Sequence, residues 1–474
     1  MAQWTAVAVT APTQEAANVV CDRLRSCDEL GSAVLLAVPD ATMQARVGSG
    51  AATLNALLTL CEELSARAGF STLSAEPLRD ARLLVLHVGA AARGGSPHPC
   101  LPQALTPLPV EGEADAICSA EWALRTVSRL FADAPPGLVI ASTDSVLLLP
   151  PSAGWLDLVA GQPLVESVAG VVVAVPGSLE LATAHGVCAP ATSAGGGGEL
   201  LGSIVYRGSE ERLRPLAAAD GSFSVYSGLL WFSRATTVRL LELHTKPPLD
   251  ACTYIGIDSG APPLALDLHS DLLAPLMRDT ARADYLPARP PSHSAPAAHQ
   301  SHEARSILWA CLRGAADERP LDASLRLCTV PGSEYLYLRS PHELRRLLLE
   351  PPRTLCPAPA APAAPDGDAD TGGGRLTASH LTAADGGDAE TAVAAAHVAV
   401  GAACVASLLE AGAAVEAGAA VAHCALRRGC VVRRGAVLSG VHSLPAGAAW
   451  PEGLAGVEVL LRPDTAAVGG AVAA

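Results

Sequence analysis

The first 142 residues alternate short apolar runs with longer stretches of helical periodicity, and this alternation constrains the fold more than any other feature. It predicts strands at 4–9, 33–38, 83–88 and 138–142, and helices at 13–26, 51–68 and 116–131. Such an order is typical of an α/β fold with a mainly parallel sheet and helices on both faces. The strands are continuously apolar because both faces of such a sheet are buried.

The alternation continues less regularly towards a low-complexity segment. Further strands are predicted at 170–175 and 224–232, and further helices at 236–243, 266–277 and 303–313. Residues 351–390 are rich in Pro, Ala, Gly and Asp and bury too little apolar surface to fold alone. We therefore predict one α/β domain over residues 1–350, a linker over 351–390 and a second domain over 391–474.

The second domain carries a six-residue repeat of aliphatic residues and glycines. The aliphatic positions are Leu409, Val415 and Val421, then Val431 and Val437, and the glycines are Gly412, Gly418, Gly429 and Gly435. Repeated glycine argues against the alternative, an Ala-rich helix, by roughly 1 kcal/mol per residue. A parallel β-helix explains the period, with the aliphatic residue inward and Gly at each corner. We predict a left-handed parallel β-helix with a structural or oligomerisation role and no chemistry.

Charge and composition exclude several classes of protein. The formal net charge is −15, which argues against a nucleic-acid groove or an anionic membrane surface as the main partner. Lys246 is the only lysine, so a Walker-type or Schiff-base lysine elsewhere is excluded. The most apolar stretch, residues 397–421, is interrupted by Glu410 and Glu416 and does not read as a membrane span.

The cysteines and the N-terminus bear on the compartment. The 13 cysteines are scattered without a C-x-x-C pair, which disfavours a zinc site or a disulfide framework. Buried thiols in a reducing compartment are the simpler interpretation. The first ten residues lack the basic segment of a signal peptide. We therefore expect a cytoplasmic protein.

A glycine-containing segment, RVGSGAATLN at residues 46–55, lies between a predicted strand and a predicted helix. Gly48 and Gly50 permit a tight turn, and the N–H groups near Ala51 and Thr53 would face an anion along the helix dipole. The segment is not a full G-x-G-x-x-G, because Thr53 stands at the third glycine position. A purely structural turn that caps the helix is the open alternative.

Asp144 ends the string Ser142-Thr-Asp at the carboxyl end of a predicted buried strand. Ligands of parallel sheets bind at that edge. A carboxylate there is suited to hold Mg²⁺ between phosphates, and a loop or helix-capping Asp is the alternative. The pairs His185-Gly186 and Ser227-Gly228 also adjoin predicted strands, where they could contact a sugar. Residues 248–260 form a polar patch that contains Asp250 and Asp258 but no serine-hydrolase elbow.

Taken together, these strings resemble the N-terminal half of animal-type L-fucokinases. The resemblance is carried, in matching order and rough spacing, by residues 46–58, 64–70, 142–144, 185–186, 227–228 and 248–260. It covers residues 4–273 well and the repeat loosely. It implies a Rossmann-like nucleotidyltransferase of the GDP-fucose pyrophosphorylase type, which serves fucose salvage by joining fucose 1-phosphate to GTP and releasing pyrophosphate. Catalysis would rest on positioning and charge neutralisation.

The resemblance also implies roles for individual residues. Nucleotide would be bound by Arg46, Gly48, Ser49, Gly50, Thr53 and Gly89. Substrate would be bound by His185, Gly186, Ser227, Gly228 and Asp258. The catalytic residues would be Asp144, which also holds Mg²⁺, and Arg93. The expected partners are GTP or another nucleotide, and fucose 1-phosphate or GDP-fucose.

Two departures from the family pattern leave a second hypothesis open. The loop at 87–96 keeps Gly89 and Arg93, but much of its expected polarity is replaced by Ala or Gly. No GHMP-type kinase segment occurs before Ala474, so phosphorylation of fucose itself is not expected. The chain would then be a catalytically weakened sugar-nucleotide-binding or regulatory module, or a truncated fragment. As such a module it would work with a GHMP kinase domain in trans.

Overall fold

The structure is a computed structural model, and it describes most of the chain. The described residues are 4–42, 47–89, 102–110, 117–159, 168–192, 200–287, 295–313, 324–338, 341–350, 352, 355, 375–377, 380–381, 396–405, 407–422 and 424–457. The chain divides into two compact units. The first comprises Met1–Ala91 and Ser119–Tyr337, and the second comprises Ala92–Cys118 and Leu338–Ala474. Most of the predicted linker lies outside the described residues.

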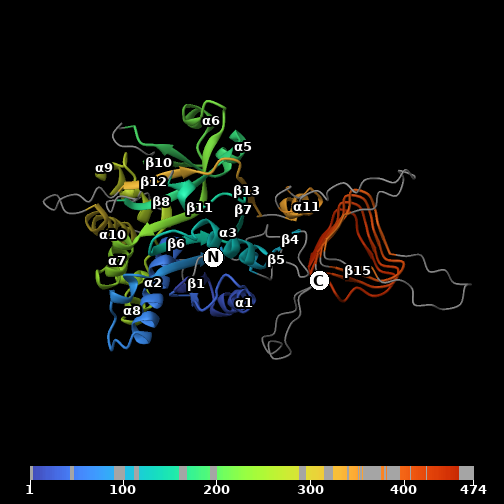
Figure 1. Ribbon diagram of the computed structural model, residues 1–474, viewed down its shortest axis with the longest axis horizontal. Coiled ribbons are helices and arrows are strands. Elements are labelled where there is room, and N and C mark those ends of the chain that lie inside the picture. Colours follow the sequence, from blue (N-terminus) through green and yellow to red (C-terminus); the bar gives the residue numbers. More distant parts are fainter. Residues whose placement is uncertain are drawn as a thin grey trace, which may run out of the picture. The chain divides into compact units, whose positions relative to one another are not determined.

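The first unit is built on a large mixed sheet, seen edge-on in Figure 1. Its first half is parallel, in the order β2 (Val34–Pro39), β1 (Ala6–Ala11), β3 (Arg82–His87) and β6 (Gly137–Ser142). The predicted strands of this half are therefore confirmed to within a few residues. Their continuous apolar character follows from burial on both faces, as in β3, where Leu83 to Leu86 are all buried.

The second half of the sheet is largely antiparallel. Strand β11 (Phe223–Ser233) runs antiparallel to β6 and to β8 (Val168–Gly177). The remaining strands are β9 (Gly186–Pro190), β10 (Leu201–Tyr206) and β12 (Ser324–Thr329). Only the pair of β12 with β8 is parallel in this half. The predicted mainly parallel sheet is therefore correct for the first half and too simple for the second.

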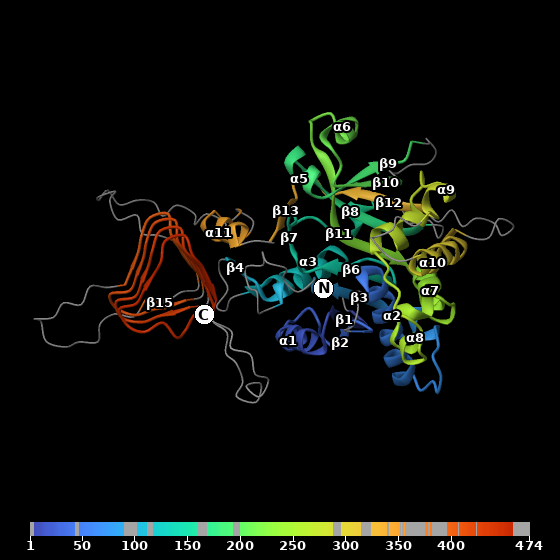
Figure 2. The ribbon, with the colours of Figure 1, turned by 180° about the vertical axis from the view of Figure 1, so that it is seen from behind.

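Helices cover both faces of the sheet (Figure 2). Helices α2 (Gly48–Arg67), α7 (Arg234–Glu242) and α10 (Ala295–Arg313) share one apolar cluster with Ala6 and Ala8 of β1. The intervening residues of β1, Val7 and Val9, are fully buried outside that cluster. Because side chains alternate along a strand, they face the opposite side, where α1 (Gln14–Leu24) contacts both β1 and α3 (Ser119–Leu130).

The predicted helix at 266–277 is irregular in the structure. A single π-helical stretch, η6 (Leu268–Leu273), is followed by the 3₁₀ turn η7 (Ala274–Leu276). The side chain of Asp267 starts the stretch, because its Oδ1 accepts hydrogen bonds from the amides of His269 at 2.9 Å and Ser270 at 2.8 Å. We call residues 266–271 the covering segment, because its backbone packs on the start of α2.

The second unit contains three ladders of short parallel strands, which the chain visits in turn, and Figure 1 shows them as a three-sided coil. One ladder is β14 (Arg375–Thr377), β17 (Ala403–Val405), β20 (Ala420–Ala422), β23 (Val437–Ser439) and β25 (Ala455–Val457). The second is β15 (His380–Leu381), β18 (Leu408–Leu409) and β21 (Ala425–Leu426). The third is β16 (His397–Val398), β19 (Ala414–Val415), β22 (Val431–Val432) and β24 (Ala449–Trp450).

The residues that face the interior of this coil differ in part from the prediction. Leu409, Val415 and Val421 belong to its buried core, as expected. In the next circuit the core takes Val432 and Leu438, so the assignment of Val431 and Val437 was wrong by one position. The reason is the register: Val415 pairs with Val432 and Val421 with Leu438, each seventeen residues on, whereas Val431 and Val437 lie sixteen residues on.

The corner glycines of the coil are confirmed. Gly412, Gly418, Gly429 and Gly435 all have φ between 70° and 77°, the left-handed region that glycine adopts without strain. Helix α11 (Pro341–Leu349) covers the first ladder, where Leu344 and Leu348 pack on Ala403 and Ala420. The neighbouring Arg345 donates from Nε to the Gly418 carbonyl at 2.7 Å.

The remaining described elements are short. They are the strands β4 (Pro107–Leu108), β5 (Ile117–Cys118), β7 (Ser145–Leu148) and β13 (Glu334–Tyr337), and the helices α4 (Trp155–Leu158), α5 (Leu179–Ala184), α6 (Glu210–Leu213), α8 (Tyr254–Asp258) and α9 (Arg282–Tyr285). None of the helices in the described ranges has the length and hydropathy needed to cross a membrane. Of the eleven cysteines whose burial is described, all but Cys311 are buried, as predicted.

Candidate functional site

The parallel strands β3 and β6 end side by side, and the chain leaves both of them towards the same edge of the sheet. The amide of Thr143, just past β6, donates to the carbonyl of His87 at 2.9 Å. The amide of Val88, just past β3, donates to Thr10 of β1 at 3.0 Å. This is the carboxyl-terminal edge, where parallel sheets bind their ligands. Asp144 and Gly89 lie on it, as the sequence predicted.

Asp144 is surrounded by small residues. Its Oδ1 accepts a hydrogen bond from the hydroxyl of Ser142. Gly89 has φ of 80°, and a Cβ there would lie 3.5 Å from the Asp144 Cβ. Gly228 has φ of 82°, and a Cβ there would meet only Ser142, at 3.9 Å. The structure thus brings Gly89 and Gly228 close to the Ser142–Asp144 pair and keeps that pair uncrowded.

The hydroxyl of Ser227 makes hydrogen bonds to the backbone within the sheet. Strand β11 has an irregular register between Tyr226 and Leu230, where it pairs with β8. The Ser227 hydroxyl donates to the Val173 carbonyl at 2.6 Å and accepts from the Leu229 amide at 3.2 Å. The side chain is buried and both bonds hold the irregularity in place. Its predicted role in lining a sugar pocket is therefore wrong for the hydroxyl, whereas the adjacent Gly228 does border Ser142.

His185 lies in a group of aromatic rings. Its ring meets Tyr335 and Tyr337 of β13 edge to face, each at a centroid distance of 4.9 Å. Burial, and secondarily the Asp144 carboxylate, raises the pKa of Tyr335 well above its usual value. Gly186 leaves room for another ring, since a Cβ there would approach the Tyr226 Cβ to 3.7 Å. His185 thus borders Tyr335 and Tyr337, whereas Gly186 borders Tyr206 and Tyr226.

The start of α2 is enclosed by the covering segment. The amides of Gly50 and Ala51 donate to the Leu266 carbonyl at 2.9 and 3.3 Å. A Cβ on Gly48 would overlap that same carbonyl oxygen, and one on Gly50 would lie 3.0 Å from the Asp267 carbonyl carbon. The expectation that these glycines expose helix amides to a phosphate is therefore wrong for the amides of Gly50 and Ala51. The glycines are required instead by close backbone packing.

Ser49 and Thr53 are engaged within the chain as well. The Ser49 hydroxyl accepts from the Leu268 amide at 3.1 Å. The Thr53 hydroxyl donates to the Ser49 carbonyl at 2.8 Å and lies 3.0 Å from Nε2 of His87. Nδ1 of that histidine lies 2.8 Å from the Thr10 hydroxyl. Burial, and secondarily His269, lowers the pKa of His87 to about 4, so this link between β1, β3 and α2 is neutral at pH 7.

Asp258 is not brought to this edge, and two further predicted residues lie outside the described part of the chain. Asp258 is exposed at the end of α8, whose Tyr254 bonds through its hydroxyl to Glu62 in the second half of α2. Glu62 is thirteen residues beyond Ser49, about 20 Å along the helix axis at 1.5 Å per residue. Arg46 and Arg93 lie outside the described residues.

Sequence reasoning missed the aromatic residues of the site. Four of the six tyrosines, Tyr206, Tyr226, Tyr335 and Tyr337, gather near His185 and His269. Tyr206 is 60 % exposed and stacks with His269 at 6.4 Å. In a chain with only 3% aromatic residues this concentration is a signal, but it becomes visible only after folding.

Arg207 is a second residue that sequence reasoning missed, because it belongs to no recognisable motif. It has φ of 47°, and in the described part of the chain it is the only residue other than glycine with a positive φ. Its guanidinium lies 5.3 Å from the centroid of the Tyr206 ring. A backbone conformation of this kind costs free energy and is found most often at functional sites. It adds a positive charge beside the aromatic group.

No three His, Cys, Asp or Glu side chains in the described ranges come together as a metal-binding group. Asp144 with the Ser142 hydroxyl offers oxygen atoms only. That set fits Mg²⁺, which commonly takes one or two protein carboxylates and completes its coordination with substrate phosphates and water.

The fold and this edge define a class: a mixed α/β domain with a candidate ligand site at the carboxyl ends of its parallel strands. Residues 75–459 match the fucose pyrophosphorylase domain, which is most of the chain. The chain therefore belongs to the fucose pyrophosphorylase domain family, and it is a sugar-nucleotide domain of the fucose salvage type. No curated protein matches the chain significantly.

Proposed function

We propose that this chain is a nucleotidyltransferase that converts GTP and fucose 1-phosphate to GDP-fucose and pyrophosphate. The observation that carries the proposal is the position of Asp144 at the carboxyl-terminal edge of β6, beside Gly89 and Gly228, in a chain of this family. A Cβ on Gly89 would lie 3.5 Å from the Asp144 Cβ, and one on Gly228 would lie 3.9 Å from the Ser142 Cβ, so neither position places a side chain against the pair.

The reaction requires an oxygen of the sugar phosphate to attack the α-phosphorus of GTP. The new bond forms as the bond from that phosphorus to the bridging oxygen breaks, and pyrophosphate leaves with the electron pair. Asp144 would hold Mg²⁺, which when bound offsets the negative charge of the phosphates. Arg207 would supply a positive charge next to the exposed ring of Tyr206. Positioning of the two substrates would contribute most of the rate enhancement.

A second candidate function is a catalytically weakened module that binds a sugar nucleotide and acts on a GHMP kinase domain in trans. The enclosure of α2 favours it, because the Ala51 amide, which was expected to face phosphate, donates to the Leu266 carbonyl instead, as does the Gly50 amide. Such a module would keep affinity for GDP-fucose without releasing pyrophosphate.

Two proposals about the architecture accompany this proposal of function. We propose that the three-sided coil is a left-handed parallel β-helix, supported by its parallel ladders and by glycines with positive φ at its corners. We also propose the division into an α/β domain over 1–350, a linker over 351–390 and the coil domain over 391–474.

The assay that separates the two functions uses purified full-length chain with GTP, Mg²⁺ and fucose 1-phosphate, and measures pyrophosphate release. Turnover supports the transferase. Binding of GDP-fucose without turnover supports the module, and absence of both rejects the two functions together. The key variant is Asp144→Asn, which is expected to lower turnover at least a hundredfold, the order of magnitude by which loss of a charge-stabilising group reduces enzymatic rates.

A matched control is available within the chain. Asp258→Asn makes the same chemical change at an exposed residue of α8 that the sequence assigned to the site. It is expected to leave turnover at the wild-type level. Loss of turnover in this variant, or wild-type turnover in Asp144→Asn, would contradict the assignment of the carboxylate.

A further inference from the structure

Two neighbouring rings of the first unit each carry a polar atom that lacks a hydrogen-bond partner. Among the described residues, Oη of Tyr226 and Nε2 of His269 are both buried and unpaired. The two rings meet edge to face with centroids 4.8 Å apart. Tyr226 is 7 % exposed. Because buried polar groups are nearly always hydrogen-bonded in native proteins, two orphans side by side indicate a missing partner.

The other buried histidine of this region shows the contrast. Both ring nitrogens of His87 are engaged, one with Thr10 and the other with Thr53. In His269 only Nδ1 has a neighbour, the Asp267 carboxylate oxygen at 3.7 Å. The His269 side chain is 34 % exposed even though its Nε2 is buried, so the pair is not sealed inside the core.

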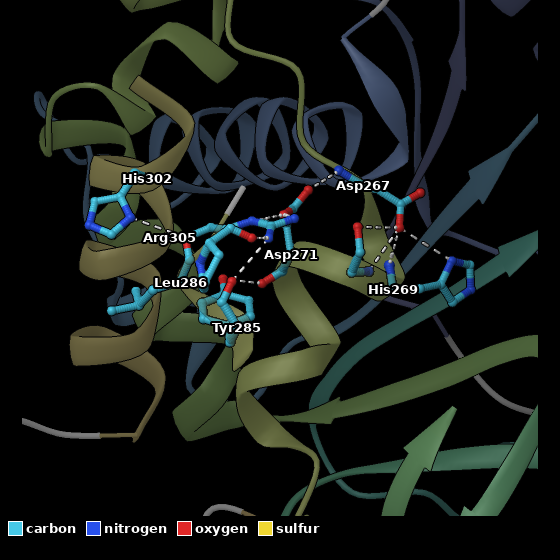
Figure 3. Close-up of polar contacts among 9 residues, drawn as sticks. Asp267, His269, Asp271, Tyr285, Leu286, His302 and Arg305 are labelled. Atoms are coloured by element: carbon cyan, nitrogen blue, oxygen red, sulfur yellow. Dashed lines mark hydrogen bonds and ion pairs between the residues drawn. The ribbon is translucent and has the colours of Figure 1, made fainter. Parts of the chain in front are cut away.

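The segment that carries His269 is held by an extended polar network (Figure 3). Arg305 of α10 donates to Oδ1 of Asp271 from Nε at 2.9 Å and from its terminal nitrogen at 2.8 Å. The other oxygen of Asp271 accepts from the Asp267 amide at 2.7 Å. Tyr285 donates to the Asp271 carbonyl at 2.8 Å. The ion pair is only about a tenth exposed, and so costly an arrangement fixes the covering segment in one conformation.

The chemistry of the two atoms limits what they can bind. Burial lowers the pKa of His269 and raises that of Tyr226, so both are neutral at pH 7. A neutral pair does not attract a phosphate. A hydroxyl group suits it, because a hydroxyl donates to one atom and accepts from the other. The adjoining rings of Tyr206 and Tyr226 supply the apolar surface that a sugar ring also needs.

The pair is linked to the proposed catalytic edge through β11 and the covering segment. Tyr226 stands two residues before Gly228, and a Cβ on Gly228 would lie 3.9 Å from the Ser142 Cβ. His269 follows Leu268, whose amide donates to the Ser49 hydroxyl at the start of α2.

We infer that Tyr226 Oη and His269 Nε2 form a subsite for a hydroxyl group of the hexose in the sugar phosphate or sugar nucleotide. The inference rests on the proposed function. The covering segment positions His269, and Arg305 acts through it without touching the ligand.

The test measures affinities of the full-length chain for GDP and for GDP-fucose by isothermal titration calorimetry, with Mg²⁺ present. In Tyr226→Phe and in His269→Gln the affinity for GDP-fucose is expected to fall about tenfold, the loss of one hydrogen bond, while the affinity for GDP stays unchanged. Tyr254→Phe, remote on α8, is the matched control and is expected to change neither affinity.

The outcomes are separable. Unchanged affinity for GDP-fucose in both variants would mean that the orphan atoms bind only water, and it would overturn the inference while leaving the proposed function intact. Equal losses for GDP and GDP-fucose would assign the pair to the nucleotide and also overturn it. Wild-type chain that binds neither ligand would reject the proposed function and this inference together.

The folded state of the variants is checked by thermal unfolding. Tyr226→Phe removes a hydroxyl that has no partner, so its melting temperature is expected to equal or exceed that of the wild type. A loss of GDP-fucose affinity at unchanged melting temperature then reports on the ligand contact and not on unfolding.

Discussion

The start of α2 and the surroundings of Asp144 both contain glycines that the sequence associates with ligand binding, but the structure uses them differently. Above Gly48 and Gly50 lies backbone of the same chain, the Leu266–Asp267 peptide. A Cβ added to Gly89 would lie 3.5 Å from the Asp144 Cβ, and a Cβ added to Gly228 would lie 3.9 Å from the Ser142 Cβ. Glycine in the first place permits self-packing, and in the second it leaves space. What lies over a glycine decides its role.

The largest effect is expected when the covering segment loses its anchor. Arg305→Met leaves the Asp271 carboxylate buried without its cation, and breaking such a pair costs about 3–5 kcal/mol. Urea unfolding followed by tryptophan fluorescence measures the loss, because five of the six tryptophans lie in the first unit. Adding Asp271→Asn is expected to restore part of the stability. A single variant as stable as wild type would show that the segment needs no anchor.

The next effect tests the packing role at α2. Gly48→Ala is expected to lower the free energy of unfolding by about 3 kcal/mol, from overlap with the Leu266 carbonyl and from a φ of 79°. Gly69→Ala is the control, since its φ is 82° and nothing lies within 4 Å of the added Cβ. It is expected to cost only about 1 kcal/mol. If both variants lose the same unfolding free energy in the urea experiment, overlap with the Leu266 carbonyl does not explain the loss in Gly48→Ala.

An intermediate effect is the pH dependence of the unfolding free energy that His87 causes. This histidine lies between the start of α2 and the strand edge that carries Asp144. His87 has a folded-state pKa of about 4 and an ordinary value of 6.5, so the unfolded chain binds more protons between those values. Its contribution to stability is complete above pH 6.5 and is lost as the pH falls towards 4.

The measurement is the difference in unfolding free energy between wild type and His87→Asn at several pH values. This difference is expected to shrink by about 2 kcal/mol between pH 7 and pH 4.5. Taking the difference cancels the opposite trend from Asp40 at the end of β2, whose pKa burial raises to about 6. A difference that stays constant with pH would show that His87 is solvated and not enclosed.

The smallest effect on stability is expected for a substitution of Gly89, beside Asp144. Gly89→Ala adds a methyl group in ordinary contact with Asp144 and strains a φ of 80°, for a cost of about 1 kcal/mol. If the space beside Asp144 admits a ligand, turnover or GDP-fucose affinity falls more than tenfold in the same variant. A loss of stability without a change in ligand affinity would show that Gly89, like Gly48, serves backbone packing and not ligand binding.

Sequence reasoning was most successful where a local pattern carries the information. The buried strands β1, β3 and β6 and the position of Asp144 follow from continuous apolar runs and from the edge rule for parallel sheets. The regular helix expected at 266–277 failed for a tertiary reason. The Asp267 side chain and Ser49 take up amides there, and the segment follows the surface of α2 instead.

The part of the site made of aromatic rings was out of reach for a similar reason. Tyr226 and His269 are 43 residues apart, with no motif around either, and only the pairing of β11 with its neighbours and the Asp271–Arg305 tether bring them together. Ser227 illustrates the converse error. Its neighbourhood was predicted well, but its hydroxyl is consumed by an irregularity of β11 that no local pattern reveals.

The coil of the second unit contains circuits of different lengths. Val415 pairs with Val432, seventeen residues on, whereas Val432 pairs with Trp450, eighteen residues on. Since each circuit touches only its neighbours, an extra residue can be absorbed at one corner without disturbing the rest. Insertion or removal of a whole circuit is therefore expected to leave the packing of the other circuits intact.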